Sequence, residues 1–225
     1  MLSTAQWLGL DDSHLVEVPN NAPHRLTAAT AIAFCQLQQA AAADGLRVGI
    51  ASSYRDFQRQ RQIWNGKFDG SRHVHDDAGR TVDMSRLDDE AKVDAILRFS
   101  AIPGASRHHW GTDLDLFAPA LLPDGQRLQL EPWEYADDGY FSPLTHWLDE
   151  HMAVFGFYRP FGDGQSVAAE PWHISHQPEA QAIQQQLSID ALAELLLASQ
   201  VAGSQLLLAR LPQLWQNYVL VNMGK

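Results

Sequence analysis

Histidine is the residue type in this chain whose number and spacing point most directly to chemistry. The 225-residue sequence contains ten histidines and one cysteine. Neutral imidazole is a common metal ligand, and a catalytic zinc site needs three protein ligands and one open position. The sequence contains no H-E-x-x-H motif, which excludes a zinc site of that helical type. The remaining candidate pairs are His73/His75, His108/His109, His146/His151 and His173/His176.

A first candidate metal site joins His108 to Asp115. Seven residues of continuous strand would separate the two by roughly 23 Å, too far to share an ion. Gly111 lies between them and allows a sharp bend, which would bring His108 back beside Asp115. Asp113 and Asp115 alternate with leucines, a pattern that predicts a strand. A polar turn leading into a strand, without a metal, is the alternative that this spacing leaves open.

A second candidate segment is Glu170-Pro171-Trp172-His173. A carboxylate three residues before a histidine ligand could act as a base beside a metal-bound water if the backbone bends there. Pro171 favours extended geometry at Glu170 and cannot donate to a central ladder, so an edge strand or a bent strand is expected. Arg55 follows a predicted strand, where it could form a surface ion pair or bind a substrate carboxylate through its bidentate fork.

The elements that must position these residues follow from the periodicity and the breakers. We predict a mixed α+β domain over residues 1–177 and a C-terminal helical extension over residues 178–225. Asn65–Arg86 shows little periodicity and is predicted to be a long loop, and a Gly-rich loop is expected at Phe161–Gly164. Strands are predicted at Leu46–Ser52, in the second half of Pro103–Phe117, and at Glu170–Ser175. Helices are predicted at Pro23–Ala43 with Thr27 as a cap, Asp56–Trp64, Asp88–Ser100, Ser142–Phe155 with Ser142 as its cap, Ala180–Ala198 and Gly203–Leu220.

Composition excludes several classes of function. Lys and Arg number 16 against 27 Asp and Glu, for a formal net charge of -11, which argues against nucleic acid or an acidic membrane surface as partner. The lone Cys35 excludes an internal disulfide and is expected to be a core residue. Since neither a secretory leader nor a membrane-spanning run is visible, a cytoplasmic location is expected, or a periplasmic one if a leader has been removed.

Three segments together, in this order, resemble the D-alanyl-D-alanine carboxypeptidases and dipeptidases of the VanY and VanX type, zinc peptidases related to lysostaphin and hedgehog proteins. The family pattern is S-x-H-x-x-G-x-x-x-D, followed by E-x-W-H, with S-x-Y-R upstream. It stands here as Ser106 to Asp115, Glu170 to His173 and Ser52 to Arg55. The resemblance spans about Leu26 to His176 and implies a small antiparallel sheet that carries the zinc site and is flanked by helices.

The resemblance also implies a role for each matching residue. His108, Asp115 and His173 would hold one zinc ion, and Glu170 would be the general base. Arg55 would assist the reacting carbonyl or the substrate carboxylate. Ser106 would line the substrate site. Trp172 and His109, each next to a proposed ligand in the sequence, are also expected to contact substrate. The implied activity is zinc-dependent hydrolysis of the terminal D-Ala-D-Ala bond of peptidoglycan stem peptides or their precursors.

Several alternatives stay open. The same fold could serve an L,D-carboxypeptidase, a peptidoglycan endopeptidase or a non-catalytic zinc-containing binding module. Asp113 departs from the family pattern, and could be a hydrogen-bond partner of a ligand or a substrate contact. Because the net charge is negative, capture of an anionic substrate is expected to depend on local arginines. The candidates are Arg55, Arg107, Arg72 and Arg80.

The remaining histidines and the leucine-rich tail are interpreted as follows. His73 and His75 could bind a second metal or be solvated, and His176 could lie next to the zinc. His14 and His24 are expected at the surface. The leucines of the tail are expected either to pack on the core or to form a homo-oligomer contact. They are Leu192, Leu195, Leu196, Leu206, Leu207 and Leu211.

Overall fold

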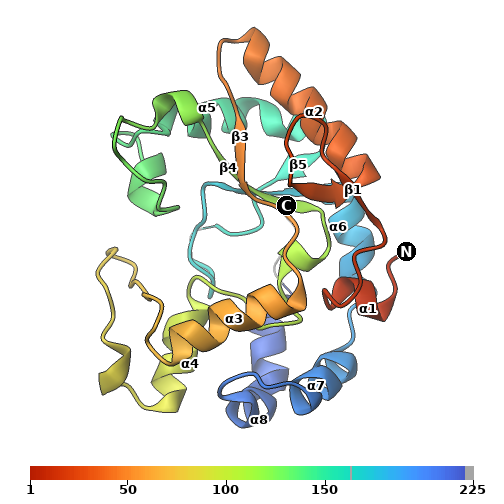
Figure 1. The fold of residues 1–225 in the computed structure, drawn as a ribbon, viewed down its shortest axis with the longest axis vertical. Coiled ribbons are helices and arrows are strands. Elements are labelled where there is room, and N and C mark those ends of the chain that lie inside the picture. The colour runs from red at the N-terminus through yellow and green to blue at the C-terminus, as the bar shows by residue number, and fades with distance from the viewer. Residues whose placement is uncertain (163, 221–225) are drawn as a thin grey trace.

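The computed structural model describes residues 1–162 and 164–220 and places a small antiparallel sheet above a group of helices (Figure 1). The sheet has four strands in the order β3-β4-β6-β5, and every neighbouring pair is antiparallel. A separate two-stranded ribbon, β1-β2, lies near the N-terminus. The strands are β1 Leu15–Glu17, β2 Arg25–Thr27, β3 Gly49–Ser52, β4 Asp113–Phe117, β5 Phe157–Tyr158 and β6 His173–His176.

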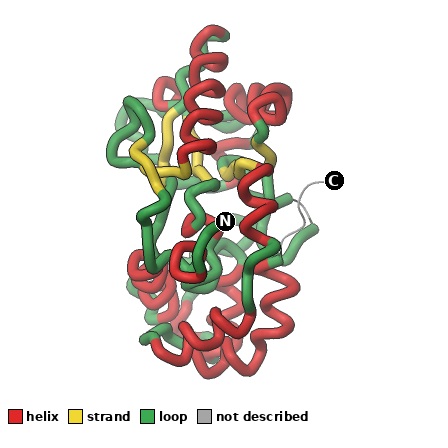
Figure 2. Tube along the Cα trace, turned by 90° about the vertical axis from the view of Figure 1, so that its right-hand side faces the viewer, coloured by secondary structure: helices red, strands yellow, loops and turns green. Residues whose placement is uncertain are grey.

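The helices are short and surround the sheet on several sides. In Figure 2 the strands lie in the upper part of the molecule and most of the lower part is helical. The π turn Trp215–Val219 follows the last α-helix, and 3-10 turns include Met84–Arg86 and Arg107–His109. The α-helices are α1 Thr4–Trp7, α2 Ala28–Ala43, α3 Phe57–Phe68, α4 Asp89–Leu97, α5 Ser142–His151, α6 Gln177–Gln184, α7 Ile189–Ala198 and α8 Ser204–Leu214.

Two groups of buried apolar side chains stabilise the fold on either side of the site. The upper group joins α2 and α5 to the sheet through residues such as Phe34, Leu114 and Phe141. The lower group joins α1, α3 and α4 to the C-terminal helices, and it includes Trp64 and Trp110. Burial of this much apolar surface is the dominant favourable contribution to folding. The site described below lies where the two groups meet.

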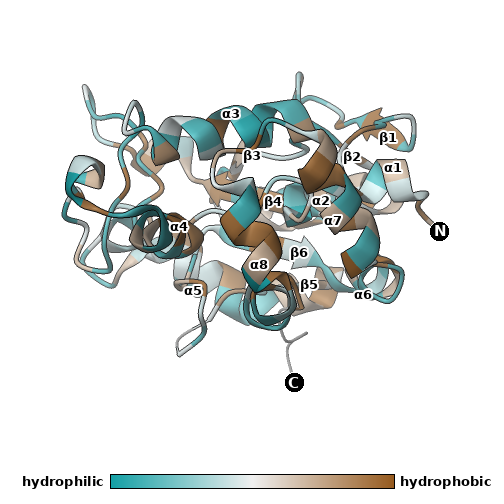
Figure 3. Ribbon diagram, turned by 90° about the horizontal axis from the view of Figure 1, so that it is seen from below, coloured by the Kyte–Doolittle hydropathy of each residue, from teal (hydrophilic) through white to brown (hydrophobic). Residues whose placement is uncertain are grey.

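The C-terminal helices α7 and α8 belong to the lower group. Leu192, Leu196, Leu207 and Leu211 are buried there, and Trp64 of α3 donates a hydrogen bond to the carbonyl of Ala202 at 2.9 Å. Figure 3 shows these helices from below, with apolar and polar residues on different sides. The tail therefore packs on the core, which was one of its two predicted roles, and its buried leucines are not free to form an oligomer contact.

The structure corrects several predicted boundaries. The helix predicted from Pro23 begins at Ala28, because Arg25–Thr27 pairs with β1, although Thr27 caps the helix as predicted. Phe141, not Ser142, is the N-cap of α5, which ends at His151. The helix predicted at Ala180–Ala198 is two helices, α6 and α7, separated by a break before Ser188.

Other elements differ in length from the prediction. Helix α3 continues to Phe68, four residues into the predicted loop, and His75 forms an isolated bridge with Thr81 inside that loop. Cys35 is half-buried rather than a core residue. Asp163 of the predicted Gly-rich loop and residues 221–225 of the predicted extension lie outside the described residues. Within the described part of the chain, none of the helices has the length and apolar character needed to cross a membrane.

Candidate metal centre and peptidase site

The centre of the site is a group of three buried side chains, His108, Asp115 and His173. One potential ligand atom from each lies within 4.8 Å of the other two. The Nε2 atom of His108 is 3.3 Å from Oδ2 of Asp115, and Nδ1 of His173 is 3.1 Å from Oδ1 of Asp115. The sequence-predicted ligands therefore come together in space.

The sheet register accounts for two members of this group. Asp115 of β4 pairs directly with His173 of β6, so their side chains project from the same face of adjacent strands. His108 reaches them from a 3-10 turn because Gly111 adopts a φ of 74°, a left-handed conformation that suits glycine. The bend predicted at Gly111 is confirmed.

Hydrogen bonds fix the orientation of both imidazole rings. Nδ1 of His108 is 2.8 Å from the carbonyl oxygen of Ser53, and Nε2 of His173 is 2.8 Å from Oδ1 of Asp113. With its proton on the nitrogen that faces Ser53 or Asp113, each ring would offer a lone pair on its other nitrogen to a cation. Those other nitrogens, Nε2 of His108 and Nδ1 of His173, both face Asp115.

Two buried polar atoms in this group also indicate a metal ion, because they form no hydrogen bond within the described residues. Oδ1 of Asp115 and Nδ1 of His173 are buried and have no hydrogen-bond partner among the described residues. Buried polar atoms without partners are rare and cost free energy, and a cation between them would satisfy both. Two imidazoles and one carboxylate form a donor set suited to zinc, with a fourth position open for water.

Asp113 supports His173 from behind and belongs to a buried network. Its carboxylate accepts hydrogen bonds from Nε of Arg107 at 2.8 Å and from the hydroxyls of Thr112 and Ser175. Burial alone would raise the pKa of Asp113, but the charge of Arg107 and the bond from His173 hold it below its ordinary value. Of the two roles predicted for Asp113, the structure supports that of hydrogen-bond partner to a ligand.

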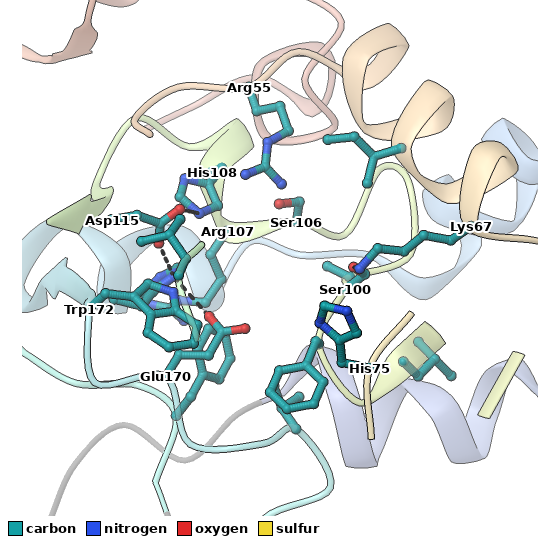
Figure 4. A pocket seen from close by; sticks show the side chains of 18 of the residues that line it. Arg55, Lys67, His75, Ser100, Ser106, Arg107, His108, Asp115, Glu170 and Trp172 are labelled. Atoms are coloured by element: carbon teal, nitrogen blue, oxygen red, sulfur yellow. Dashed lines mark hydrogen bonds and ion pairs between the residues drawn. The ribbon is translucent and has the colours of Figure 1, made fainter. Parts of the chain in front are cut away.

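Glu170 lies next to the three-residue group. Its Oε2 atom is 3.4 Å from Nδ1 of His173, and Figure 4 shows the carboxylate beside the group at the cavity. The strand predicted from Glu170 begins only at His173, and the preceding residues turn so that the Glu170 carbonyl accepts from the His173 amide at 3.0 Å. This is the bent backbone that the sequence analysis requires for a base beside a metal-bound water.

Arg55 enters the cavity from the segment that follows β3. Its guanidinium donates to Oε1 of Gln60 at 2.8 Å and to Oγ of Ser52 at 3.2 Å, and its amide donates to the carbonyl of His108 at 3.0 Å. Burial lowers the pKa of Arg55, while the charges of Asp115 and Glu170 oppose that shift. No carboxylate among the described residues pairs with Arg55, so it is not the surface ion pair that the sequence left open.

A cavity of about 340 Å³ contains this group and extends away from it. Ser106 and Trp172, both predicted to contact substrate, line the cavity. Figure 4 shows Trp172 near Asp115, and Ser106 between His108 and the opposite wall. The cavity walls therefore include the predicted substrate-contact residues except His109.

His109 does not reach the cavity. It is fully buried, its Nδ1 lies 2.6 Å from the carbonyl of Arg55, and its Nε2 accepts from the amide of Gly104 at 3.1 Å. Burial lowers the pKa of His109 to about 3, which keeps the ring neutral. The expectation that His109 contacts substrate is wrong, because this ring instead holds the backbone of Arg55.

The remaining histidines also lie away from the three-residue group. His176 points away from the three-residue group and contacts Glu179 and Thr30. His14 and His24 are half-buried rather than at the surface, and each makes a hydrogen bond. No second metal group containing His73 and His75 occurs within residues 1–162 and 164–220.

The predicted arginines contribute less to the cavity than expected. Arg107 lines it but is buried against Asp113, Tyr158 and Ser175. Arg72 and Arg80 do not line it. Three further lining residues, Lys67, Ser100 and Glu131, were not expected from the sequence, because no motif marks them. His75, which was considered only as a metal ligand or a solvated residue, also lines the cavity.

Comparison with known proteins places the chain in a family. Residues 23–179 match the family model described as VanY, D-alanyl-D-alanine carboxypeptidase. An uncharacterized protein of Haemophilus influenzae is 46% identical over 121 residues, which are 52% of this chain and 92% of that protein. A D-alanyl-D-alanine carboxypeptidase of Enterococcus faecalis is 28% identical over 144 residues, 62% of this chain and 44% of that protein.

Solved structures show the same fold. VanYB in complex with D-alanine-D-alanine superposes with a TM-score of 0.53 at 22% identity, covering 82% of this chain and 90% of that one. A glutamate-to-alanine mutant of the vancomycin-resistance D,D-pentapeptidase VanY, in complex with Zn(II), gives 0.52 at 25% identity, covering 80% and 90%. The chain therefore belongs to the VanY D-alanyl-D-alanine carboxypeptidase family and is a metallopeptidase.

Proposed function

We propose that this metallopeptidase is a zinc-dependent D,D-carboxypeptidase that removes the terminal D-alanine from peptidoglycan stem peptides or their precursors. The observation that carries the proposal is the convergence of His108, Asp115 and His173 within 4.8 Å, where two of the buried ligand atoms form no hydrogen bond within the described part of the chain. The VanY structure in complex with Zn(II) and the VanYB structure in complex with D-alanine-D-alanine support the metal and the substrate class.

The proposed metal ligands are His108 Nε2, His173 Nδ1 and an oxygen of Asp115. When bound, zinc lowers the pKa of a coordinated water and polarises the scissile carbonyl. Asp113 and the Ser53 carbonyl would hold the proton on the far nitrogen of each imidazole, which would leave the near nitrogen to the ion. The chain thus supplies a preorganised set of donors.

Glu170 is the proposed general base. Its carboxylate lies 3.4 Å from a ligand nitrogen, so a water held at the centre is within its reach. It would accept the proton of the attacking water and later donate it to the leaving amine of D-alanine. Arg55, whose guanidinium is held by Gln60 and Ser52, would stabilise the negative charge that develops on the carbonyl oxygen.

Ser106 and Trp172 are the proposed substrate contacts among the predicted residues. Ser106 is 2% exposed, but its side chain borders the cavity, where a hydroxyl can donate to or accept from a peptide. Trp172 packs against Tyr135 with ring centroids 5.4 Å apart, which holds the indole rigidly in place. These residues would position the peptide backbone at the metal.

The domain organisation remains a proposal as well. We propose residues 1–177 as the catalytic unit and 178–225 as an extension that packs on it through the lower apolar group. The oligomeric state and the cytoplasmic location stay predictions.

The test is incubation of the zinc-loaded protein with three defined peptidoglycan substrates, followed by mass spectrometry. Loss of one alanine from a pentapeptide that ends in D-Ala-D-Ala is the expected result. Loss of alanine from the tetrapeptide alone would instead indicate an L,D-carboxypeptidase, and cleavage of a cross-linked dimer alone would indicate an endopeptidase. An unchanged mass for all three, with one zinc bound, would contradict the proposal.

A further inference from the structure

The backbone of Arg55 is held by the 3-10 turn Arg107–His109, which carries the proposed ligand His108. The Arg55 amide donates to the His108 carbonyl at 3.0 Å, and the Arg55 carbonyl lies 2.6 Å from Nδ1 of His109. In Figure 4 the Arg55 guanidinium points into the cavity, beside His108 and near Ser106. Because both polar backbone groups of Arg55 bind consecutive residues of one turn, the turn fixes the place of Arg55 relative to the candidate metal centre.

The buried ring of His109 makes one hydrogen bond at each nitrogen. Nε2 accepts from the amide of Gly104 at 3.1 Å, and an amide N–H cannot accept in return. The proton of the neutral ring is therefore on Nδ1, which donates it to the Arg55 carbonyl. Without this donor the carbonyl would have no hydrogen-bond partner among the described residues, so the backbone of Arg55 would shift or admit water.

Two segments outside the family domain pack against His109 and its partner Gly104. A Cβ atom at Gly9 would lie 2.5 Å from Nδ1 of His109, and the φ of 76° at this position suits glycine. On the other side, a Cβ atom at Gly104 would lie 2.9 Å from a methyl carbon of Leu195 in α7. Gly9 and Leu195 both lie outside residues 23–179, which match the family model. Parts of the chain that the family model does not cover therefore support the two bonds of His109.

We propose that His109 is a positioning residue for Arg55 in the peptidase reaction. The ring holds the Arg55 backbone so that the guanidinium meets the carbonyl oxygen of the substrate at the metal centre. His109 does not line the cavity and both of its nitrogens are occupied, so it acts on the reaction through Arg55. A displacement of about 1 Å in a positioned group can lower a rate about 10²-fold. This inference rests on the proposed function, because it takes Arg55 to stabilise the developing oxyanion.

Two substitutions separate the hydrogen bond of His109 from the volume of its ring. The amide nitrogen of His109→Asn can take the place of Nδ1 and donate to the Arg55 carbonyl, whereas His109→Phe keeps an aromatic ring without a donor. We expect His109→Phe to lower kcat about tenfold or more and His109→Asn to lower it less than about threefold, with KM little changed in both. A lower kcat for His109→Asn than for His109→Phe would overturn the inference.

The decisive comparison repeats His109→Phe in the Arg55→Ala protein. If the ring acts through Arg55, the second change should alter kcat less than about twofold in this background, because effects of residues that act as one unit do not add. An equal loss in both backgrounds would overturn the inference. Zinc affinity is measured on the same samples, because His108 precedes His109 in the turn. A zinc affinity lowered about tenfold or more in His109→Phe would show that the ring acts on the ligand instead, and would also overturn it.

His176→Asn is the matched control. His176 is another buried histidine with two hydrogen-bond partners, Glu179 and Thr30, and it does not line the cavity. We expect this variant to be less stable than the parent in urea denaturation and to keep the parent kcat. Urea denaturation of the two His109 variants establishes that both are folded under the assay conditions.

Nitrogen-15 NMR of the zinc-loaded protein gives a result that does not depend on the substrate. We expect the His109 proton on Nδ1, and we expect the Arg55 Nε–H signal to shift in His109→Phe and to stay in place in His109→Asn. If the parent cleaves one of the other peptidoglycan substrates and releases no D-alanine, the proposed function fails, and these signals and the same kcat comparison still decide the role of His109. A proton on Nε2, or an Arg55 signal that is unchanged in His109→Phe, would overturn the inference even if D-alanine is released.

Discussion

Nε2 of His173 lies 2.8 Å from Oδ1 of Asp113, and this bond turns the opposite ring nitrogen of His173 toward Asp115. The two partners lie two positions apart in register, because Asp115 pairs with His173 and Asp113 pairs with Ser175. Asp113 and Asp115 therefore lie on the same face of β4 but have different roles. Asp115 is a proposed ligand, and Asp113 orients the histidine ligand.

Replacing Asp113 with Asn should weaken zinc binding while the fold is retained. The amide keeps the size of the side chain but accepts less strongly from His173, and partners of this kind typically change metal affinity by about 10- to 100-fold. A competition titration with a zinc chelator measures the affinity. Ser85→Ala, at an exposed position, is the control, and an unchanged zinc affinity in Asp113→Asn would contradict the assigned role.

Replacing Asp113 with Ala should have a larger effect on stability. The change leaves Arg107 buried, at 4% exposure, without its carboxylate partner. Breaking a buried ion pair from one side typically costs about 3 to 5 kcal/mol. Urea denaturation should show the loss in the free energy of unfolding, and a loss below 1 kcal/mol would show that the network around Arg107 is not needed for the fold.

Replacing Glu170 with Ala should retain zinc and lose most of the turnover. Loss of a general base typically lowers the rate about 10²- to 10⁴-fold, and Glu170 is not among the proposed ligands. Metal analysis and release of D-alanine are measured on the same sample. Near-normal hydrolysis would contradict the assignment of the base.

Replacing Arg55 with Ala should lower kcat by about 10²- to 10³-fold at unchanged zinc content, the effect expected for loss of a group that stabilises an oxyanion. Arg55→Lys should not restore the rate, because a single ammonium cannot reproduce the two bonds to Gln60 and Ser52. Arg59→Ala is the matched control, since Arg59 is exposed and lies outside the cavity. A normal kcat in Arg55→Ala would exclude the proposed role.

Glu179 should make the fold sensitive to acid. Burial alone would raise its pKa, but hydrogen bonds from His176, Thr27 and Thr30 lower it to about 2, against 4.5 ordinarily. Because the folded-state pKa is the lower one, the stabilisation is full above pH 4.5 and is lost as pH falls toward 2. Because the Glu179 side chain is about one-third exposed, we expect its ionised carboxylate to contribute on the order of 2 kcal/mol to the free energy of unfolding.

Glu179→Gln tests this stabilisation. The variant should be less stable than the parent at pH 7, and the difference should shrink as the pH falls from 4.5 to 3. Guanidinium denaturation at several pH values measures both proteins. A difference that stays constant with pH would show that the carboxylate charge is not the cause.

The candidate metal centre could be predicted from sequence because its residues carry strong local signals. Gly111 permits the bend that returns His108 to the strand, and the alternation in β4 places Asp113 and Asp115 on one face. The resemblance to a known family supplied the choice of His173 and Glu170. Spacing alone left those assignments open.

Other features of the site and fold could not be predicted, because they depend on tertiary contacts that no local sequence pattern encodes. His109 resembles a site residue in sequence, but its burial against Gly104 and Arg55 makes it structural. Lys67 and Glu131 are 64 positions apart and line one cavity only because α3 and the segment before α5 both border it. The early strand β2 was missed because three residues are too few to show a period.

Zinc content measured together with D-alanine release tests the central claim most directly. His173→Ala is compared with His146→Ala, a histidine whose side chain is 62% exposed and far from the proposed ligands in the sequence. We expect one zinc per chain and D-alanine release for the parent and for His146→Ala, and loss of both for His173→Ala. Retention of one zinc and of normal release by His173→Ala would contradict the assignment of His173 as a zinc ligand.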